Sequence, residues 1–413
     1  MTAHSPAGTG RVDLRATLQR MESPTAPYYL LLGATSGLTV LGLIMVLSAS
    51  SVTSYQQSGS SFTVFKSQAM FAVIGVIGAV VAARMPMKVW RHLGWPTFLL
   101  AMALQLLVFS PLGVSVMGNT NWIEVAGFRM QPSEFGKISL VLLAAGVLTM
   151  KRKRLAEFKH VVIPLIFPCG LGFMALVMGG HDLGTTLVLA AILGSVLFVA
   201  GIKLRIFGIS LAVAAATATV LVWTSGNRMG RISTWLGGCS EGALQDGCWQ
   251  PVHGKYALAD GGWWGVGLGA SREKWGWMAE AHNDFIFAIL GEELGLPGTL
   301  TVLCLYLAIG YACYRLISTS KDFFVRLATT GVMAWILVQA TINMASVLGL
   351  LPVIGVPLPL VSSGGSQLVT SLFALGMVMS FARNEPECKA ALAQRPKLVG
   401  RTRAILPTGR RGR

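Results

Sequence analysis

Long apolar stretches separated by short polar connections run along most of the chain. Most of them are close to the ~20 residues that a helix needs to cross the hydrocarbon core of a membrane. The pattern predicts an all-α polytopic membrane protein with ten transmembrane helices within residues 28–383 and one large extracytoplasmic loop. The predicted spans are 28–50, 67–83, 93–112, 132–150, 161–179, 183–201, 206–224, 285–314, 326–348 and 366–382.

Three segments fall outside this pattern. Residues 1–27 and the basic residues 384–413 are expected to be disordered tails, because such polar or charged sequence buries too little apolar surface to fold. The third segment is the large polar loop, about 225–283, which contains six of the 11 tryptophans. Trp favours the headgroup level, so this loop is expected to lie on the membrane surface. The first apolar stretch is too long for a signal-peptide core and is read as a span.

Composition and charge add an orientation. The chain is 53% hydrophobic and 12% charged, against about a quarter charged in soluble domains. It nevertheless carries a formal net charge of +16. With both termini in the cytoplasm, 25 of the 33 Lys and Arg lie on the inner side, as the positive-inside rule requires. The basic tail is therefore expected to face anionic lipid, with no nucleic-acid partner.

The cysteines predict one disulfide and no metal site. Cys239 and Cys248 share the large outer loop, where a bridge forms if the compartment is oxidising. Two free thiols are the alternative. No cysteine pair has the spacing of a zinc site.

The end of the large loop places charged groups at the start of an apolar helix. Glu280, His282 and Asp284 precede the span, and Glu292 and Glu293 follow within it. Charged groups at this depth are costly and are usually retained for function. A helix cap would explain one acid but not the cluster, so Asp284 is the leading catalytic candidate.

Further polar groups gather on the same outer side. Gln131, Glu134 and Lys137 recur every three residues and share one face of a helix. Two interpretations stay open for the last two: an ion pair that hides both charges from lipid, or a cation facing an anionic lipid headgroup. The other candidate binding residues are Asp182, Arg228, Arg231, Lys274, His282, Ser362 and Ser366.

Two backbone features accompany these residues. The Gly-rich run 261–269 follows no strand, so a nucleotide-binding loop is rejected; its glycines are expected to permit close packing over a ligand. Residues 357–367 predict a re-entrant or irregular segment, which membrane depth tolerates only where it is buried in protein or lines a cavity.

Five separated motifs resemble the SEDS family (shape, elongation, division and sporulation), and the resemblance covers residues 28–383. The motifs are Gln131-Pro132-Ser133-Glu134 with Lys137; Asp182-Leu183-Gly184-Thr185; the Gly-rich loop with Lys274; His282-Asn283-Asp284-Phe285; and Ser362-Ser363-Gly364-Gly365-Ser366.

The resemblance implies a peptidoglycan glycosyltransferase of the bacterial plasma membrane that polymerises lipid II and works with a class B penicillin-binding transpeptidase. The family's essential Asp corresponds to Asp284. Residues 280–282 and 361–367 look more like the division branch than the elongation branch, which implies a septal location and other division membrane proteins as partners. The chain departs from the family at Asn283 and Ser363, and at Asn121, where the family usually has Arg.

The residues fit that chemistry. Pyrophosphate is a weakly basic leaving group, so a single base that deprotonates the attacking sugar hydroxyl suffices, unlike the two carboxylates of glycosidases. Asp284 is that base, and the candidate cations are Lys137, Arg228, Arg231 and Lys274. A second role for Asp284, holding Mg²⁺ or Mn²⁺ against the pyrophosphate, stays open.

Two other classes of function compete. A lipid II flippase would use Glu292 and Glu293 as a proton relay, yet alternating access also predicts polar groups in the inner helix halves, and few are present. A non-catalytic division scaffold is favoured only if Asp284 is dispensable. An elongation-type polymerase is the alternative within the family.

Overall fold

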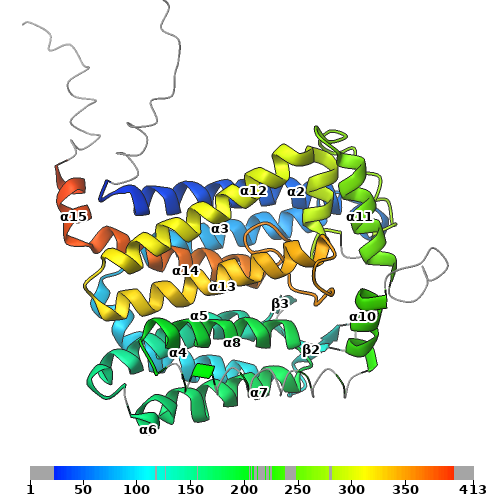
Figure 1. Cartoon of the computed structure of the whole chain (residues 1–413). Coiled ribbons are helices and arrows are strands. Elements are labelled where there is room, and N and C mark those ends of the chain that lie inside the picture. The colour runs from blue at the N-terminus through cyan, green and yellow to red at the C-terminus, as the bar shows by residue number, and fades with distance from the viewer. Residues whose placement is uncertain are drawn as a thin grey trace, which may run out of the picture.

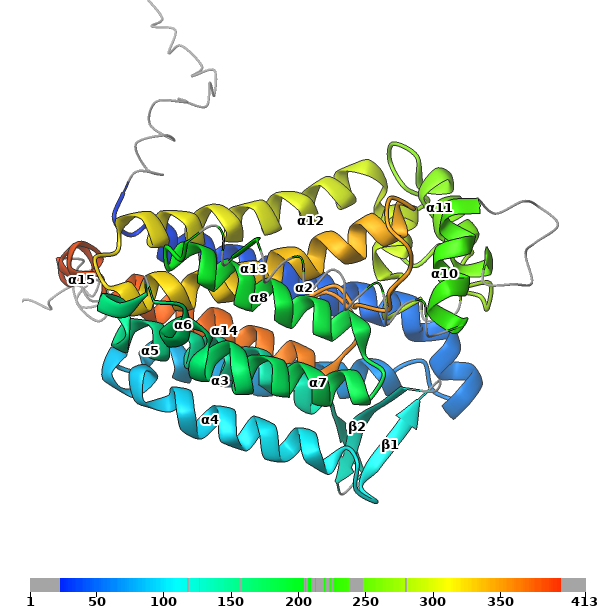
Figure 2. The same cartoon turned by 60° about the horizontal axis from the view of Figure 1, so that its bottom comes forward.

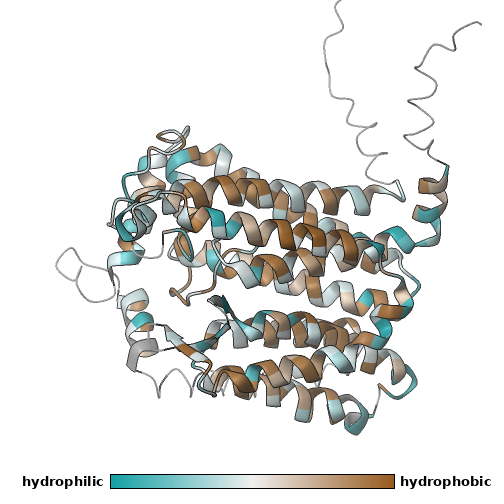
Figure 3. Ribbon diagram, turned by 180° about the vertical axis from the view of Figure 1, so that it is seen from behind, coloured by the Kyte–Doolittle hydropathy of each residue, from teal (hydrophilic) through white to brown (hydrophobic). Residues whose placement is uncertain are grey.

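The computed structural model describes residues 23–116, 119–125, 127–155, 157–203, 205, 207–208, 212, 219, 223, 226–237, 248–278 and 281–394. Its long helices lie side by side in one elongated bundle (Figure 1). Hydrophobic residues predominate along the length of the helices, and hydrophilic residues concentrate toward the two ends (Figure 3). This distribution is the one expected of a bundle that crosses a membrane.

Helices occupy the predicted spans that lie within the described residues. The long helices are α2 (Ala26–Ser58), α3 (Thr63–Arg84), α4 (Met87–Leu107), α5 (Pro132–Met150), α7 (Leu171–Gly179, preceded by the irregular turns Val162–Gly170), α8 (Leu183–Val199), α12 (Ile286–Thr319), α13 (Phe323–Val347) and α14 (Gly365–Asn384). Seven helical stretches in this part of the chain are long and apolar enough to cross a membrane. The predicted span 206–224 lies mostly outside the described residues, so the count of ten stays a prediction.

The expectation of an all-α fold is wrong in one place. Strands β1 (Gly113–Val116), β2 (Asn119–Val125) and β3 (Phe128–Met130) form a three-stranded antiparallel sheet in the order β1-β2-β3. These strands are rich in Val and other β-formers, and Gly127 adopts the positive φ of +81° that a tight hairpin turn favours. The hydropathy pattern missed the sheet because it lies just outside a span.

The predicted eighth span also differs from a straight helix. Within α12, Gly295 has φ of +63° and is followed by Pro297, so the chain kinks between a short first segment and the long remainder. A side chain at Gly295 would meet the backbone nitrogen of Gly265 at 2.4 Å. Glycine is therefore required here both by the backbone conformation and by the close approach of the outer loop.

Helix packing separates a buried centre from a lipid-facing rim. Helices α5, α13 and α14 are mostly buried, whereas α3 exposes most of its surface. Helix α3 lies against α14 through small residues: a side chain at Gly376 would come within 2.5 Å of the carbonyl oxygen of Ala79. Such close backbone approach is typical of helix pairs in membranes.

The bundle has two different ends (Figures 1 and 2). The loop end carries the sheet, α10 (Gly226–Gly237), α11 (Trp249–Gly261), residues 262–278 and 281–285 and the irregular segment 352–364, together with the starts of α5, α8, α12 and α14. The basic end carries α6 (Phe158–Val161), α15 (Pro386–Ala393) and the basic connections. Cations at the basic end include Arg84, Lys88, Arg91, Lys151, Arg152, Lys153, Arg154, Lys159, Arg315, Lys321, Arg326, Arg383 and Lys389.

Candidate active site

Asp284 lies at the loop end, just before α12. The helix begins at Ile286, its N-cap residue is Phe285, and the Phe285 side chain makes no cap hydrogen bond. The interpretation of Asp284 as a helix cap stays a prediction. Asp284 is partly buried, in the short segment that joins the outer loop to the bundle.

The backbone around Asp284 is held from outside its own segment. The carbonyl oxygens of three consecutive residues each accept a hydrogen bond from a different donor, on α13 or on the segment before α14. The bonds are Ser363 N to His282 O (2.9 Å), Ser362 Oγ to Asn283 O (2.7 Å) and Asn343 Nδ2 to Asp284 O (2.8 Å). Fixing the main chain on both sides orients the Asp284 carboxylate in advance, as a catalytic group requires.

The irregular segment that the sequence predicted at 357–367 lies at residues 352–364, before α14 begins at Gly365. Its polar backbone groups are paired with side chains. Each donor or acceptor comes from a neighbouring helix or from the segment itself. Asn343 Nδ2 donates to Val356 O (2.8 Å), Gln339 and Gln367 Nε2 to Pro357 O (3.0 and 3.2 Å), Tyr306 to Pro359 O, Gln68 Nε2 to Ser362 O (3.2 Å), and Leu358 N to Ser362 Oγ (2.8 Å). These bonds explain how irregular backbone persists inside the bundle.

Arg231 is the predicted cation that the fold brings to Asp284. It lies on α10, and its Nη1 donates to Val353 O at 3.2 Å. Gly355, with φ of +79°, lies between the two charged groups: a Cβ built there would be 3.5 Å from Asp284 Oδ2 and 3.9 Å from Arg231 Nη1. The absence of a side chain at Gly355 leaves open a space that borders both the carboxylate and the guanidinium.

Three other predicted residues come together where α5, α8 and α14 begin. Gln131 Nε2 donates to Asp182 Oδ2 at 2.8 Å, and Gln131 N donates to Ser366 Oγ at 3.3 Å. Asp182 also caps α8, because its Oδ1 accepts from Thr185 N at 2.8 Å. Gln131 thus links the starts of three helices at the loop end.

Lys137 and Glu134 form the ion pair that the sequence left as one of two interpretations. Lys137 Nζ lies 2.7 Å from Glu134 Oε1, and both side chains are buried. The same Nζ donates to Gln339 Oε1 at 3.0 Å and lies 5.2 Å from the centre of the Trp335 ring. Through Gln339 the lysine supports the irregular segment. Contact between Lys137 and a lipid headgroup stays a prediction.

Lys274 belongs to a different buried cluster, which fastens the outer loop to α12 and α2. Its Nζ lies 3.1 Å from Glu293 Oε1 and donates to Gly269 O at 2.6 Å. Glu293 also accepts from Ser48 Oγ at 2.6 Å. Its neighbour Glu292 accepts from Ser271 Oγ at 2.5 Å and from Arg272 N at 2.7 Å. The two glutamates that a proton relay would use are therefore engaged in holding the loop.

Two glycines of the Gly-rich run pack closely on this helix. A Cβ at Gly261 would be 2.0 Å from Gly291 O, and one at Gly265 would be 2.3 Å from Glu293 O. The glycines are needed because two backbones touch. The predicted close packing is found against α12 at these two glycines, and packing over a ligand stays a prediction.

Glu273, another acid of the large loop, has a raised pKa. Glu273 Oε2 lies 2.7 Å from His253 Nδ1, and the imidazole is stacked on Trp277. Burial raises the pKa of the Glu273 carboxyl, and the hydrogen bond and charge of His253 partly oppose this. The pair ties α11 to the loop that follows it.

Some predicted residues lie outside the described part of the chain: Cys239, Glu280 and the side chain of Arg228. Cys248 is disulfide-bonded, in agreement with the predicted bridge, although Cys239 is not described. Among the described residues, no group of three or more His, Cys, Asp or Glu could hold a metal ion. A divalent cation held by Asp284 stays a prediction.

Sequence reasoning missed the buried amides that organise the site. Gln339 and Asn343 lie four residues apart in the apolar helix α13, and both are buried. Residues at this spacing share a helix face, and polar side chains inside a span usually face the interior and serve function. The spacing of the two amides within an apolar span was the sequence signal that could have identified them.

Comparison with known proteins identifies the family. The sequence model of the family of FtsW, RodA and SpoVE proteins, described as "Cell cycle protein", matches residues 29–387. This chain belongs to that family. The match confirms the resemblance to the SEDS family, and with the apolar helices it establishes a multi-pass membrane protein.

Individual relatives agree over most of the chain. The probable peptidoglycan glycosyltransferase FtsW of Mycobacterium tuberculosis is 40% identical over 370 residues, which cover 89% of this chain and 70% of the relative. The FtsW of Geobacter sp. (strain M18) is 36% identical, covering 83% and 93%. Stage V sporulation protein E of Bacillus subtilis is 34% identical, covering 87% and 98%.

Solved structures share the fold. A chain from a study of a peptidoglycan synthase complex that coordinates polymerisation and crosslinking superposes with a TM-score of 0.69 at 23% identity, covering 86% of this chain and 97% of the other. The rod shape determining protein RodA of Thermus thermophilus gives a TM-score of 0.64 at 22% identity, covering 86% and 96%. These helices therefore adopt the family's arrangement.

Proposed function

We propose that this protein is a peptidoglycan glycosyltransferase that polymerises lipid II into glycan strands during septal wall synthesis, with Asp284 as general base. The observation that carries the proposal is the partly buried Asp284, whose main chain is fixed by three hydrogen bonds and which shares the space at Gly355 with Arg231. Relatives named FtsW peptidoglycan glycosyltransferases, 33–40% identical to this chain, support the activity.

The reaction requires one proton transfer and one displacement. Asp284 takes the proton of the attacking sugar hydroxyl, and the hydroxyl oxygen forms a bond to the anomeric carbon of the second sugar. The bond from that carbon to the pyrophosphate oxygen breaks, and undecaprenyl pyrophosphate leaves with the electron pair. Because pyrophosphate is weakly basic, it needs charge stabilisation rather than a proton, and Arg231 is the described cation nearest to this task.

The other cations act at a distance from this step. Lys137 is buried with Glu134 and, through Gln339, stabilises the irregular segment. Lys274 holds the loop against Glu293. Both are assigned a positioning role, because their ammonium groups are already bonded to protein oxygens. Arg228 stays a candidate partner of the pyrophosphate.

The orientation of the protein follows from its charges. We assign the basic end to the cytoplasm and the loop end to the outside, by the positive-inside rule. Asp284 then lies on the side where lipid II presents its sugars. A class B penicillin-binding transpeptidase is the proposed partner, and the fold shared with a chain from a peptidoglycan synthase complex supports this assignment.

A flippase receives no comparable support. A relay through Glu292 and Glu293 needs these carboxylates free to exchange protons, yet they accept hydrogen bonds from Ser271, Arg272 and Ser48, and Lys274 pairs with one of them. Their arrangement favours a fixed anchor.

The proposal is tested with purified protein, its cognate transpeptidase and lipid II, by following glycan polymer on gels. Asp284→Asn should lower the polymerisation rate by roughly 10²–10⁴ while leaving folding and partner binding unchanged, because the asparagine keeps size and backbone contacts. Asp260→Asn, which changes an exposed acid on α11, is the control and should be fully active. Near-normal polymer from Asp284→Asn would refute the general-base role.

A further inference from the structure

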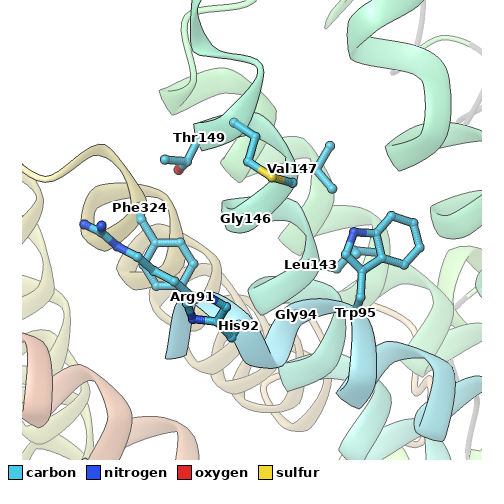
Figure 4. A pocket seen from close by; sticks show the side chains of 10 residues that line it. Arg91, His92, Gly94, Trp95, Leu143, Gly146, Val147, Thr149 and Phe324 are labelled. Carbon is cyan, nitrogen blue, oxygen red and sulfur yellow. The ribbon is translucent and has the colours of Figure 1, made fainter. Parts of the chain in front are cut away.

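A pocket lies at the basic end of the bundle, opposite the end that carries Asp284, and the proposed reaction makes no use of it. Its volume is about 250 Å³. It opens between α4, α5 and the start of α13 (Figure 4). The residues that matter for its chemistry are Arg91, His92 and Trp95 on α4, Gly146 and Thr149 on α5, and Phe324 on α13.

The walls of this pocket provide groups for an anion. Arg91 pairs with Asp322, yet half of its side chain stays exposed. His92, the residue after Arg91 on α4, is also exposed. The hydroxyl of Thr149 is buried and has no hydrogen-bond partner among the described residues. A buried hydroxyl without a partner is unfavourable, and an oxygen of a bound ligand would satisfy it.

The surroundings of the pocket are strongly positive. Lys88 lies one turn before His92 and is exposed. Arg152 follows α5 directly, and its guanidinium lies 4.8 Å from the centre of the Phe323 ring, beside the pocket residue Phe324. The acid closest in sequence to Phe324, Asp322, is already engaged by Arg91. An anionic ligand is therefore favoured over a neutral or cationic one.

The pocket continues into an apolar surface. Trp95 is 40% exposed, and the next turn of α4 presents Leu99 and Leu100 at 61% and 52% exposure. Trp prefers the headgroup level of a membrane, and exposed leucines beyond it face hydrocarbon. A ligand that fits both parts has an anionic head and apolar chains.

We propose that this pocket binds an anionic phospholipid of the cytoplasmic leaflet, with its phosphodiester at Thr149, Arg91 and His92 and its acyl chains along the α4 surface beyond Trp95. Basic pockets between helices on the cytoplasmic side bind such headgroups in other membrane proteins. The site is independent of the glycosyltransferase step and of the outer loop.

The test measures lipid retention by the full-length protein in a neutral detergent with native mass spectrometry. Phosphatidylglycerol and phosphatidylcholine with identical acyl chains are added in competition. The wild type should retain phosphatidylglycerol with a clear preference, because one basic group near an anionic headgroup changes affinity about fivefold. Equal retention of the two lipids would overturn the proposal.

Gly146→Leu is the decisive variant, because it fills the pocket without changing any charge. A Cβ at Gly146 meets nothing within 4 Å, so the helix should tolerate it, and the preference should fall at least about fivefold. Gly33→Leu is the matched control. A Cβ at Gly33 also meets nothing within 4 Å, and Gly33 lies exposed on α2 near the same end of the bundle. This variant should prefer phosphatidylglycerol as strongly as the wild type does. An unchanged preference in Gly146→Leu would overturn the proposal.

Thr149→Val provides a second variant if Gly146→Leu fails to fold. It keeps the shape of the side chain and removes only the unpaired hydroxyl, so the preference should fall while thermal unfolding is unchanged. The same preference as in the wild type would count against the proposed phosphodiester contact. Displacement of the lipid by soluble glycerol phosphate at equal concentration would overturn the assignment to a membrane lipid.

Discussion

The buried Lys137–Glu134 pair gives the sharpest prediction about stability. Lys137→Met keeps the apolar stem and removes the charge. At the observed 2.7 Å, an effective dielectric of ~20 gives an attraction of about 6 kcal/mol. Desolvation of the two ions offsets most of this attraction, so the intact pair contributes little net stability. Removing one partner has a different consequence.

After Lys137→Met, Glu134 would be a buried carboxylate without its cation. Its second oxygen, Oε2, already has no hydrogen-bond partner among the described residues, and Gln339 Oε1 would lose one of its two donors, keeping only Trp335 Nε1. Breaking one side of a buried pair costs about 3–5 kcal/mol. We expect this loss of unfolding free energy in detergent, together with a loss of polymer yield, because Gln339 holds the irregular segment at Pro357.

The double variant Glu134→Gln, Lys137→Met separates support from substrate contact. Neither charge is then left unpaired, so most of the stability should return, and polymer yield should return with it if the lysine acts only through the fold. Thermal unfolding and lipid II polymerisation are measured on the same preparations. A single Lys137→Met variant as stable as the wild type would refute the ion-pair reasoning, and a stable but inactive double variant would place Lys137 at the substrate.

Three further outcomes are expected. Gly261→Ala should destabilise the protein by ~1–3 kcal/mol in thermal unfolding, because the new Cβ would lie 2.0 Å from Gly291 O; Gly230→Ala, with nothing within 4 Å, should not, and equal stabilities would contradict the packing argument. The raised pKa of Glu273 means that the folded protein holds this proton to higher pH than the unfolded chain, so its contribution to stability falls as pH rises above about 4.5. In thermal unfolding, Glu273→Gln should therefore be more stable than the wild type above about pH 4.5. A variant that is less stable than the wild type in this range would contradict the raised pKa. A reporter fused after Arg154 should be found in the cytoplasm, and its appearance outside would reverse the proposed orientation.

Much of the architecture is a local property of the chain. A run of about 20 apolar residues crosses a membrane whatever its neighbours are, so the spans, the irregular segment before α14 and the concentration of polar groups at one end could be read from residue order. The same reasoning singled out Asp284, because a carboxylate is costly at the start of an apolar helix wherever that helix packs.

The tertiary structure decided which charges meet. Lys274 and Arg231 looked alike as cations near one membrane face, but packing pairs the first with Glu293 and brings the second to Gly355 near Asp284. The Lys137–Glu134 pair lies within one helix, and the sequence offered it as one of two interpretations. The kink at Gly295 follows from the same packing, since it lets the outer loop rest on α12. Hydrophobic periodicity fixes the face and length of an element, whereas the partner of a charge depends on which distant segments the fold places within about 4 Å of it.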